Sequence, residues 1–200
     1  MSGNLTSLVP SAFISDLKNK TSDSHRKLES LPISASILSP YMKISDYIHY
    51  LSLMHDVHKN TENVIFPLLS EIITDLHERK KSHLIEDDLN FLKFNKRDSN
   101  SVFDTQEITV PFALGILYVI EGSSLGGRFI LKNISKIRGL DNGQGTVYFQ
   151  GYGDTTSNFW KNFLSYLSEY EENHHCGNAI IEGATYAFDS IYNHFRSIEK

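Results

Sequence analysis

Apolar residues recur at helical spacing along most of the chain, and this pattern predicts long helices. In residues 11–30 the apolar stripe carries Phe13, Leu17 and Leu28, and Thr21 and His25 continue the line at steps of four. Ser11 or Pro10 can open this helix. We therefore expect His25 to point inward with the core residues.

The same periodicity predicts several more helices and a single all-α domain. Ser45 can cap a second helix that runs toward Phe66-Pro67, where the proline should kink or end it. Helical segments are also expected over 72–94, 110–137, 158–171 and 178–198. Residues 95–104 are polar and suit a loop, and 146–150 have β character but are short and isolated. The prediction is one helical bundle over residues 10–200, preceded by a flexible tail of residues 1–9.

Composition narrows the class of protein. The net charge of −5 gives no basic excess to suggest nucleic acid as a partner, and the single cysteine, Cys176, excludes a disulfide framework. We expect no membrane span, because the apolar run from Val110 stops at Glu121, short of the roughly 20 residues that a span needs. The first residues lack the pattern of a secretory signal. These features predict a cytoplasmic protein.

A glycine-rich stretch interrupts the most apolar predicted helix. Gly115, Gly122, Gly126 and Gly127 each cost about 1 kcal/mol relative to alanine inside a helix, so a compensating contact is expected. A tight helix–helix contact is one interpretation, and a kinked helix lying over a flat ligand is another. Gly122-x-Ser124-x-Gly126 also spells a nucleophile elbow, but that motif needs a strand and a parallel sheet, which the pattern does not predict.

Histidines offer two further hypotheses. His55, His58 and Glu62 share one helix face and could contribute to a non-heme metal site, although histidines at the surface or partly buried are the commoner case. His25 is either a core histidine bonded to a backbone carbonyl or an axial ligand to heme iron. Together with the glycine stripe, His25 suggests a flat ligand held between two helices.

Four motifs resemble the heme oxygenase family, most closely its bacterial branch found with bacteriophytochromes. Thr21-x-x-x-His25-x-x-Leu28-Glu29 resembles the proximal-helix signature, and the run from Tyr118 to Gly127 resembles the distal-helix signature. Two weaker matches follow: Tyr152-Gly153 together with Trp160-Lys161-x-Phe163-Leu164, and Ala184-x-x-Ala187-Phe188.

The resemblance implies a heme oxygenase-like fold with heme between the first helix and the kinked glycine-rich helix. Heme would be both cofactor and substrate, with dioxygen as co-substrate and biliverdin, carbon monoxide and ferrous iron as products. His25 would be the axial iron ligand, and Gly122 and Gly126 the distal glycines whose backbone approaches the open face of the heme. Ser123 stands where animal members carry an aspartate that organises the distal water network. The proton relay must therefore be built differently in this chain.

The resemblance also assigns supporting residues and partners. Lys18 and Lys161 would pair with the heme propionates, and Tyr118, within the distal signature, would contact the heme. The external electron donor would be a ferredoxin or a flavoprotein reductase, and the biliverdin could feed a bacteriophytochrome. Two alternatives stay open at this point: a heme-binding or heme-sensing protein without turnover, and a non-heme iron oxidase of the same helical fold.

Overall fold

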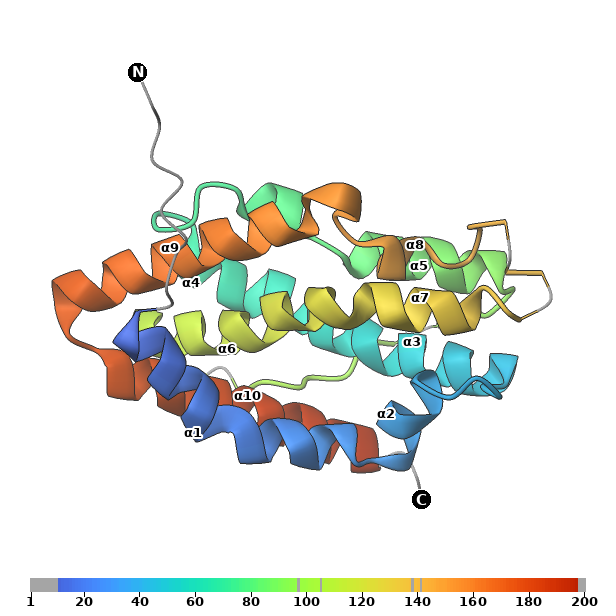
Figure 1. Cartoon of the computed structure of the whole chain (residues 1–200), viewed down its shortest axis with the longest axis horizontal. Helices are drawn as coiled ribbons and strands as arrows, with labels where there is room; N and C mark the ends of the chain where they lie inside the picture. Colours follow the sequence, from blue (N-terminus) through green and yellow to red (C-terminus); the bar gives the residue numbers. More distant parts are fainter. Residues whose placement is uncertain (1–10, 97, 105, 138, 141, 198–200) are drawn as a thin grey trace.

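The chain folds as a helical bundle, as the periodicity predicts. The computed structural model describes residues 11–197 apart from 97, 105, 138 and 141, so the expected tail over residues 1–9 lies outside the described residues. Every regular element in the described part of the chain is helical, which confirms the all-α class (Figure 1). The elements are α1 (Ala12–Glu29), α2 (Pro32–Ile37), α3 (Ile44–Asn60), η1 (Thr61–Ile65), α4 (Phe66–Leu69), η2 (Leu76–Arg79), α5 (Ser82–Phe91), α6 (Val110–Ser123), η3 (Ser124–Gly126), α7 (Gly127–Ile134), α8 (Val147–Gln150), η4 (Gly153–Thr155), α9 (Thr156–His174) and α10 (Gly177–Ser197).

Helix α10 is the common support of the bundle. It packs against α6 and along α1 (Figure 1). Helices α6 and α7 form one nearly continuous run through the middle of the molecule, with α9 beyond them in this view. We call the part of this run from Gly122 to Gly127 the distal segment.

A helix begins at the predicted residue where a side chain there can cap the helix N-terminus. The prediction at Ser11 is confirmed, because its hydroxyl accepts a hydrogen bond from the N–H of Ile14 at 3.2 Å. The prediction at Ser45 is wrong: Lys43, two residues earlier, occupies the cap position of α3, and no side chain caps the helix. Pro67 lies in the first turn of α4, directly after the π-helical turn η1. Proline has no N–H and cannot donate a hydrogen bond to the preceding turn, so the regular α-helical hydrogen bonding is interrupted here.

Two segments differ from the predicted pattern. Residues 72–94 do not form one helix but divide into η2 and α5. Residues 147–150 form the short helix α8 rather than a strand, because the Asp88 carboxylate accepts hydrogen bonds from the N–H groups of Val147 and Tyr148 at 2.8 and 2.9 Å. Those groups are the ones that a helix N-terminus leaves unpaired. Burial raises the pKa of Asp88 to about 6.

The apolar central run corrects one expectation. Val110–Ile134 is long and apolar enough to cross a membrane by length and composition, so the expectation that no segment would qualify was too strict. Half of its most apolar window is buried inside the protein, where α6 packs against α10. It therefore has the character of the core helix of a soluble protein.

Two glycines let α6 and α10 approach each other closely. A Cβ atom on Gly115 would lie 2.0 Å from the carbonyl oxygen of Ile180, and one on Gly183 would lie 2.1 Å from that of Phe112. The interpretation as a tight helix–helix contact is therefore confirmed for Gly115. It does not hold for Gly126, whose added Cβ would meet no atom within 4 Å.

The two classes of glycine should respond differently to alanine. Gly115→Ala should lower the free energy of unfolding by roughly 3 kcal/mol, the upper end of overpacking costs, because backbone and not a flexible side chain blocks the new methyl group. Gly126→Ala is the matched control and should leave stability unchanged or raise it by up to about 1 kcal/mol through helix propensity. Urea unfolding of both variants measures the difference, and equal stabilities would contradict this account of the α6–α10 contact.

Candidate functional site

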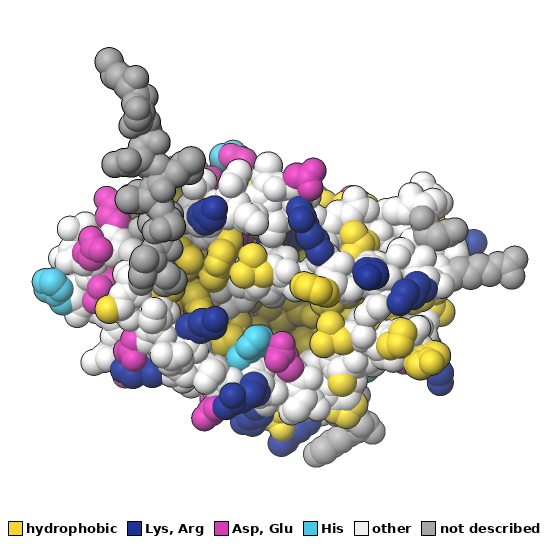
Figure 2. All heavy atoms as spheres, viewed as in Figure 1, with side chains coloured by type: hydrophobic (Ala, Val, Ile, Leu, Met, Phe, Trp, Pro, Cys, Tyr) yellow, Lys and Arg dark blue, Asp and Glu magenta, His cyan; other side chains and the backbone are white. Residues whose placement is uncertain are grey.

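A hollow lined by hydrophobic side chains opens on the face where α1 lies opposite the α6–α7 run. Figure 2 shows a histidine and an acidic side chain at its rim, with lysine or arginine side chains nearby. An apolar hollow with a few polar groups on its edge suits a flat, mostly apolar ligand.

His25 lies on the α1 side, and its side chain is 55% exposed. The expectation that it points inward with the core is therefore wrong. Each step of four residues turns about 40° past a full helical turn. The line that is buried at Leu17 and Thr21 has consequently left the core at His25.

The ring of His25 is held on two sides. Nε2 lies 3.3 Å from Oε1 of Glu29, one turn later on α1, and the ring packs 5.3 Å from that of Phe188 on α10. Histidines that bind metals usually give their second ring nitrogen to a carboxylate or carbonyl. His25 has such a carboxylate partner in Glu29.

The distal segment presents bare backbone. Helix α6 ends at Ser123, tightens into the 3₁₀ turn η3 and continues as α7 from Gly127. Gly126 faces open space, and Ser123 is exposed beside it. At Gly122 a Cβ would rest 3.7 Å from the Trp160 ring, whereas at Gly127 it would meet the carbonyl oxygen of Phe149 at 2.9 Å. The two glycines therefore have different roles. Gly127 lets the backbone of α8 pack against the distal segment, whereas Gly126 leaves the space beside the segment empty.

The other predicted site residues come from three helices. Tyr118 on α6 packs 5.5 Å from the Trp160 ring, and burial raises its pKa. Lys18 is exposed two turns before His25 on α1, and Lys161 is exposed on α9, directly after Trp160. Among the described residues, neither ammonium group forms a salt bridge, so both are available to an anionic ligand.

Sequence reasoning missed a cluster of buried charges behind the distal segment. Glu121 is 2% exposed, pairs with Nη1 of Arg79, and accepts the Tyr152 hydroxyl at 2.9 Å. Nζ of Lys81 lies 3.8 Å from Glu121 and donates to the Ser124 hydroxyl at 2.6 Å. The signal for this cluster was present in the sequence, because Glu121 is the one charged residue in the apolar run that starts at Val110.

Burial and pairing set the protonation of this cluster. Burial lowers the pKa of Lys81, and Glu121 partly opposes that effect. The pKa of Arg79 is raised even though burial lowers it, because Asp75 and Glu121 stabilise the cation. The Asp75 carboxylate receives both Nε and Nη2 of Arg79 at 2.8 Å, so the guanidinium is fixed in position.

The two competing interpretations fail on geometry. His55 pairs with Glu86, His58 contacts Tyr148, and Glu62 accepts hydrogen bonds from the start of α5, so these side chains diverge. The described residues contain no group of three or more His, Cys, Asp or Glu that could hold a metal ion. A nucleophile elbow also lacks its strand, since Ser124 lies in η3 between two helices.

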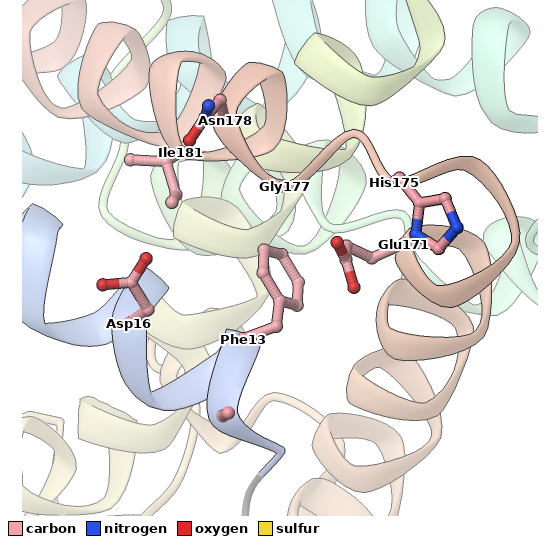
Figure 3. A pocket seen from close by; sticks show the side chains of 8 residues that line it. Phe13, Asp16, Glu171, His175, Gly177, Asn178 and Ile181 are labelled. Atoms are coloured by element: carbon pink, nitrogen blue, oxygen red, sulfur yellow. The ribbon is translucent and has the colours of Figure 1, made fainter.

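A second hollow lies apart from these residues. It has a volume of about 440 Å³ and lies between the start of α1 and the junction of α9 with α10 (Figure 3). Asp16, Glu171 and His175 supply its ionisable lining, and Phe13 stands beside them. No predicted site residue lines it, and its two carboxylates disfavour an anionic ligand.

The Arg79–Glu121 pair should be strongly coupled. Glu121→Leu alone and Arg79→Met alone should each lower the free energy of unfolding by roughly 3 kcal/mol, the lower end for breaking a buried pair, because Asp75 still holds Arg79 and Tyr152 still holds Glu121. The double variant should lose much less than the sum of the two. Urea unfolding of all four proteins gives the coupling energy, and additive losses would show that the pair does not stabilise the distal segment.

Comparisons with known proteins agree with one another. The family model for heme oxygenase matches residues 11–197. The heme oxygenase PigA of Pseudomonas aeruginosa is 24% identical over 173 residues, which are 84% of each chain.

Solved structures of similar fold include three bacterial heme oxygenases. The Neisseria meningitidis enzyme aligns with a TM-score of 0.76 at 25% identity, covering 92% of this chain and 90% of the other. The Leptospira interrogans enzyme gives 0.78 at 17% identity, covering 93% and 99%. Heme oxygenase-1 of Synechocystis, solved in complex with heme, gives 0.72 at 17% identity, covering 94% and 92%.

Proposed function

This chain belongs to the heme oxygenase family, and from that premise we propose that heme lies in the hollow between α1 and the distal segment. As a heme oxygenase it cleaves heme with dioxygen and reducing equivalents, releasing biliverdin, carbon monoxide and ferrous iron. The observation that carries the placement is that an exposed imidazole, His25, and a bare stretch of backbone, at Gly126, belong to the two elements, α1 and the α6–α7 run, between which the apolar hollow opens (Figure 2).

His25 is proposed as the axial ligand of the heme iron. Glu29 holds one ring nitrogen and leaves the other for the metal. Phe188 packs against the ring and limits its tilt. A histidine that is half exposed before heme arrives needs no core rearrangement to reach the iron.

The distal segment supplies the opposite wall. When bound, heme supplies both the iron that activates dioxygen and the porphyrin ring that is cleaved. Gly126 keeps this side free of side chains, and Gly122 rests over Trp160. The exposed hydroxyl of Ser123 can hold water and pass protons there.

The remaining assignments concern orientation and partners. Lys18 and Lys161 lie on different helices, α1 and α9, and would pair with the two propionates, while Tyr118 would contact the heme from the distal signature. Electrons would come from a ferredoxin or a flavoprotein reductase in the cytoplasm. The biliverdin could serve a bacteriophytochrome.

Replacing His25 should remove the axial bond. We expect His25→Ala to bind hemin with a weakened and shifted Soret band and to lose biliverdin formation, whereas wild type gives a sharp band that decays when reductant is added in air. The matched control is His77→Ala, which removes a histidine whose side chain is 75% exposed on η2. An unchanged Soret band and unchanged turnover in His25→Ala would exclude His25 as the ligand.

Filling the gap at Gly126 should separate binding from turnover. In Gly126→Leu the new side chain would occupy the distal side, so the hemin affinity should change little while biliverdin formation falls by ~10²-fold, a loss of about 2.7 kcal/mol in transition-state stabilisation. Gly126→Ala is the control for the backbone effect. Full activity of Gly126→Leu would place the reactive face of the heme elsewhere.

A further inference from the structure

A buried lysine reaches the distal segment from behind. Lys81 lies between η2 and α5 and is 3% exposed. Its Nζ donates a hydrogen bond to the Ser124 hydroxyl at 2.6 Å. Within the described part of the chain, no other side chain hydrogen-bonds to Ser124, Leu125 or Gly126. Lys81 therefore supplies the side-chain hydrogen bond that ties η3, with the bare backbone at Gly126, to the rest of the bundle.

Ser124 takes part in two of the bonds that shape this turn. Its hydroxyl accepts from Lys81, and its carbonyl oxygen accepts the N–H of Gly127, which closes η3. Leu125 and Gly126 lie between these two bonds and are exposed. Glycine reaches more backbone conformations than other residues, so a turn that ends in two glycines gains most from an external contact. The bond from Lys81 is such a contact.

The backbone of Lys81 is fixed separately from its side chain. Oε1 of Glu62, in the π-helical turn η1, accepts the N–H groups of Lys81 and Ser82 at 2.8 and 2.7 Å. The other carboxylate oxygen accepts the Ser82 hydroxyl at 2.6 Å. These bonds hold the chain where α5 begins, and they do not involve the ammonium group. A change at the end of the Lys81 side chain should therefore leave the local backbone in place.

The ammonium group of Lys81 is held on other sides as well. Nζ lies 3.8 Å from Oε1 of Glu121 and 4.2 Å from the centre of the Tyr152 ring. A buried ammonium group is costly without a partner, and here Glu121 supplies the opposite charge. A hydrogen bond from a charged donor is shorter and roughly twice as strong as a neutral one. The bond to Ser124 is of this kind.

Arg79, the other cation of this cluster, has its contacts outside the distal segment. Its guanidinium is bound by Asp75, Glu121 and the carbonyl oxygen of Phe159. Arg79 therefore anchors the cluster, whereas Lys81 is the cation that contacts the turn. This division of contacts singles out Lys81 as the residue through which the cluster fixes the turn.

We propose that Lys81 is a positioning residue for heme cleavage, which acts through Ser124 and keeps the backbone at Gly126 in a single conformation. This inference rests on the proposed function, in which the turn is the wall opposite His25. Lys81 does not touch the heme, because its side chain is buried behind the turn. A misplacement of about 1 Å can cost ~10²-fold in rate, so a bond that fixes this turn should affect turnover more than heme affinity.

The first test is hydrogen exchange in the heme-free protein, with Lys81→Met compared with Lys80→Met. Methionine keeps an apolar chain against the Tyr152 ring and removes the donor. Lys80 is the exposed neighbour and gives the matched control. Exchange at the N–H of Gly127 should be ~10-fold faster in Lys81→Met, the order that a hydrogen bond to a charged group contributes to local stability. Lys80→Met should exchange as wild type does.

The heme-loaded protein gives two further readouts. Lys81→Met should bind hemin with wild-type affinity and form biliverdin ~10-fold more slowly. The C–O stretching band of carbon monoxide added to the reduced protein should shift, because it reports the surroundings of the distal face. A lysine that only stabilises the fold would lower the free energy of unfolding and leave both the band and turnover unchanged.

Ser124→Ala keeps the test independent of the buried charge. This variant removes the acceptor and leaves Lys81 with Glu121, so it should fold even where Lys81→Met does not, with the same faster exchange and slower turnover. Because both variants break one hydrogen bond, the double variant should be no slower than either. Additive losses, or wild-type exchange and turnover in both single variants, would overturn the role of Lys81 alone. A wild-type protein that binds or degrades no hemin would overturn the proposed function and this role with it.

Discussion

The close approach of α6 to α10 is the constraint on which the site depends. Gly115 and Gly183 remove the side chains that would hold these helices apart, since either added Cβ would lie about 2 Å from a carbonyl oxygen. Helix α10 also carries Phe188, which packs against His25 on α1. One helix therefore sets the position of both walls, and the separation between imidazole and distal backbone follows from a backbone contact that has almost no freedom to relax.

The glycines of the distal segment destabilise it as a helix, and the buried charges next to it fix its conformation. Glycines weaken a helix interior by about 1 kcal/mol each, so an isolated sequence of this kind would fray. Glu121 lies directly before it and is held by Arg79 and Tyr152, while Lys81 donates to Ser124 in the following turn. A buried ion pair adds little net stability over an apolar pair, but losing one partner is severely unfavourable. The cluster therefore acts chiefly to exclude other conformations of the turn.

Sequence periodicity predicted the bundle, but not which surface each candidate site residue would face. The step of four that joins Thr21 to His25 looked like a core stripe, and only the position of α10 shows that the line leaves the core. Gly115 and Gly126 are alike in sequence, yet one admits a backbone and the other leaves a gap. The start of α8 is helical because a distant carboxylate, Asp88, binds its N–H groups. Each of these outcomes is decided by a partner far away in the sequence, which local pattern cannot reveal.

Adjacent serines divide the work behind the distal wall. Successive residues on a helix point about 100° apart, so Ser123 and Ser124 reach different partners. Ser124 accepts a hydrogen bond from the ammonium group of Lys81, which belongs to the charge cluster, whereas the Ser123 hydroxyl donates to the carbonyl oxygen of Ile120 and stays exposed. Burying a charge without a partner is costly, and here each buried charge has one. A turn of one residue along the helix therefore separates an exposed neutral hydroxyl from the fixed charges behind the distal segment.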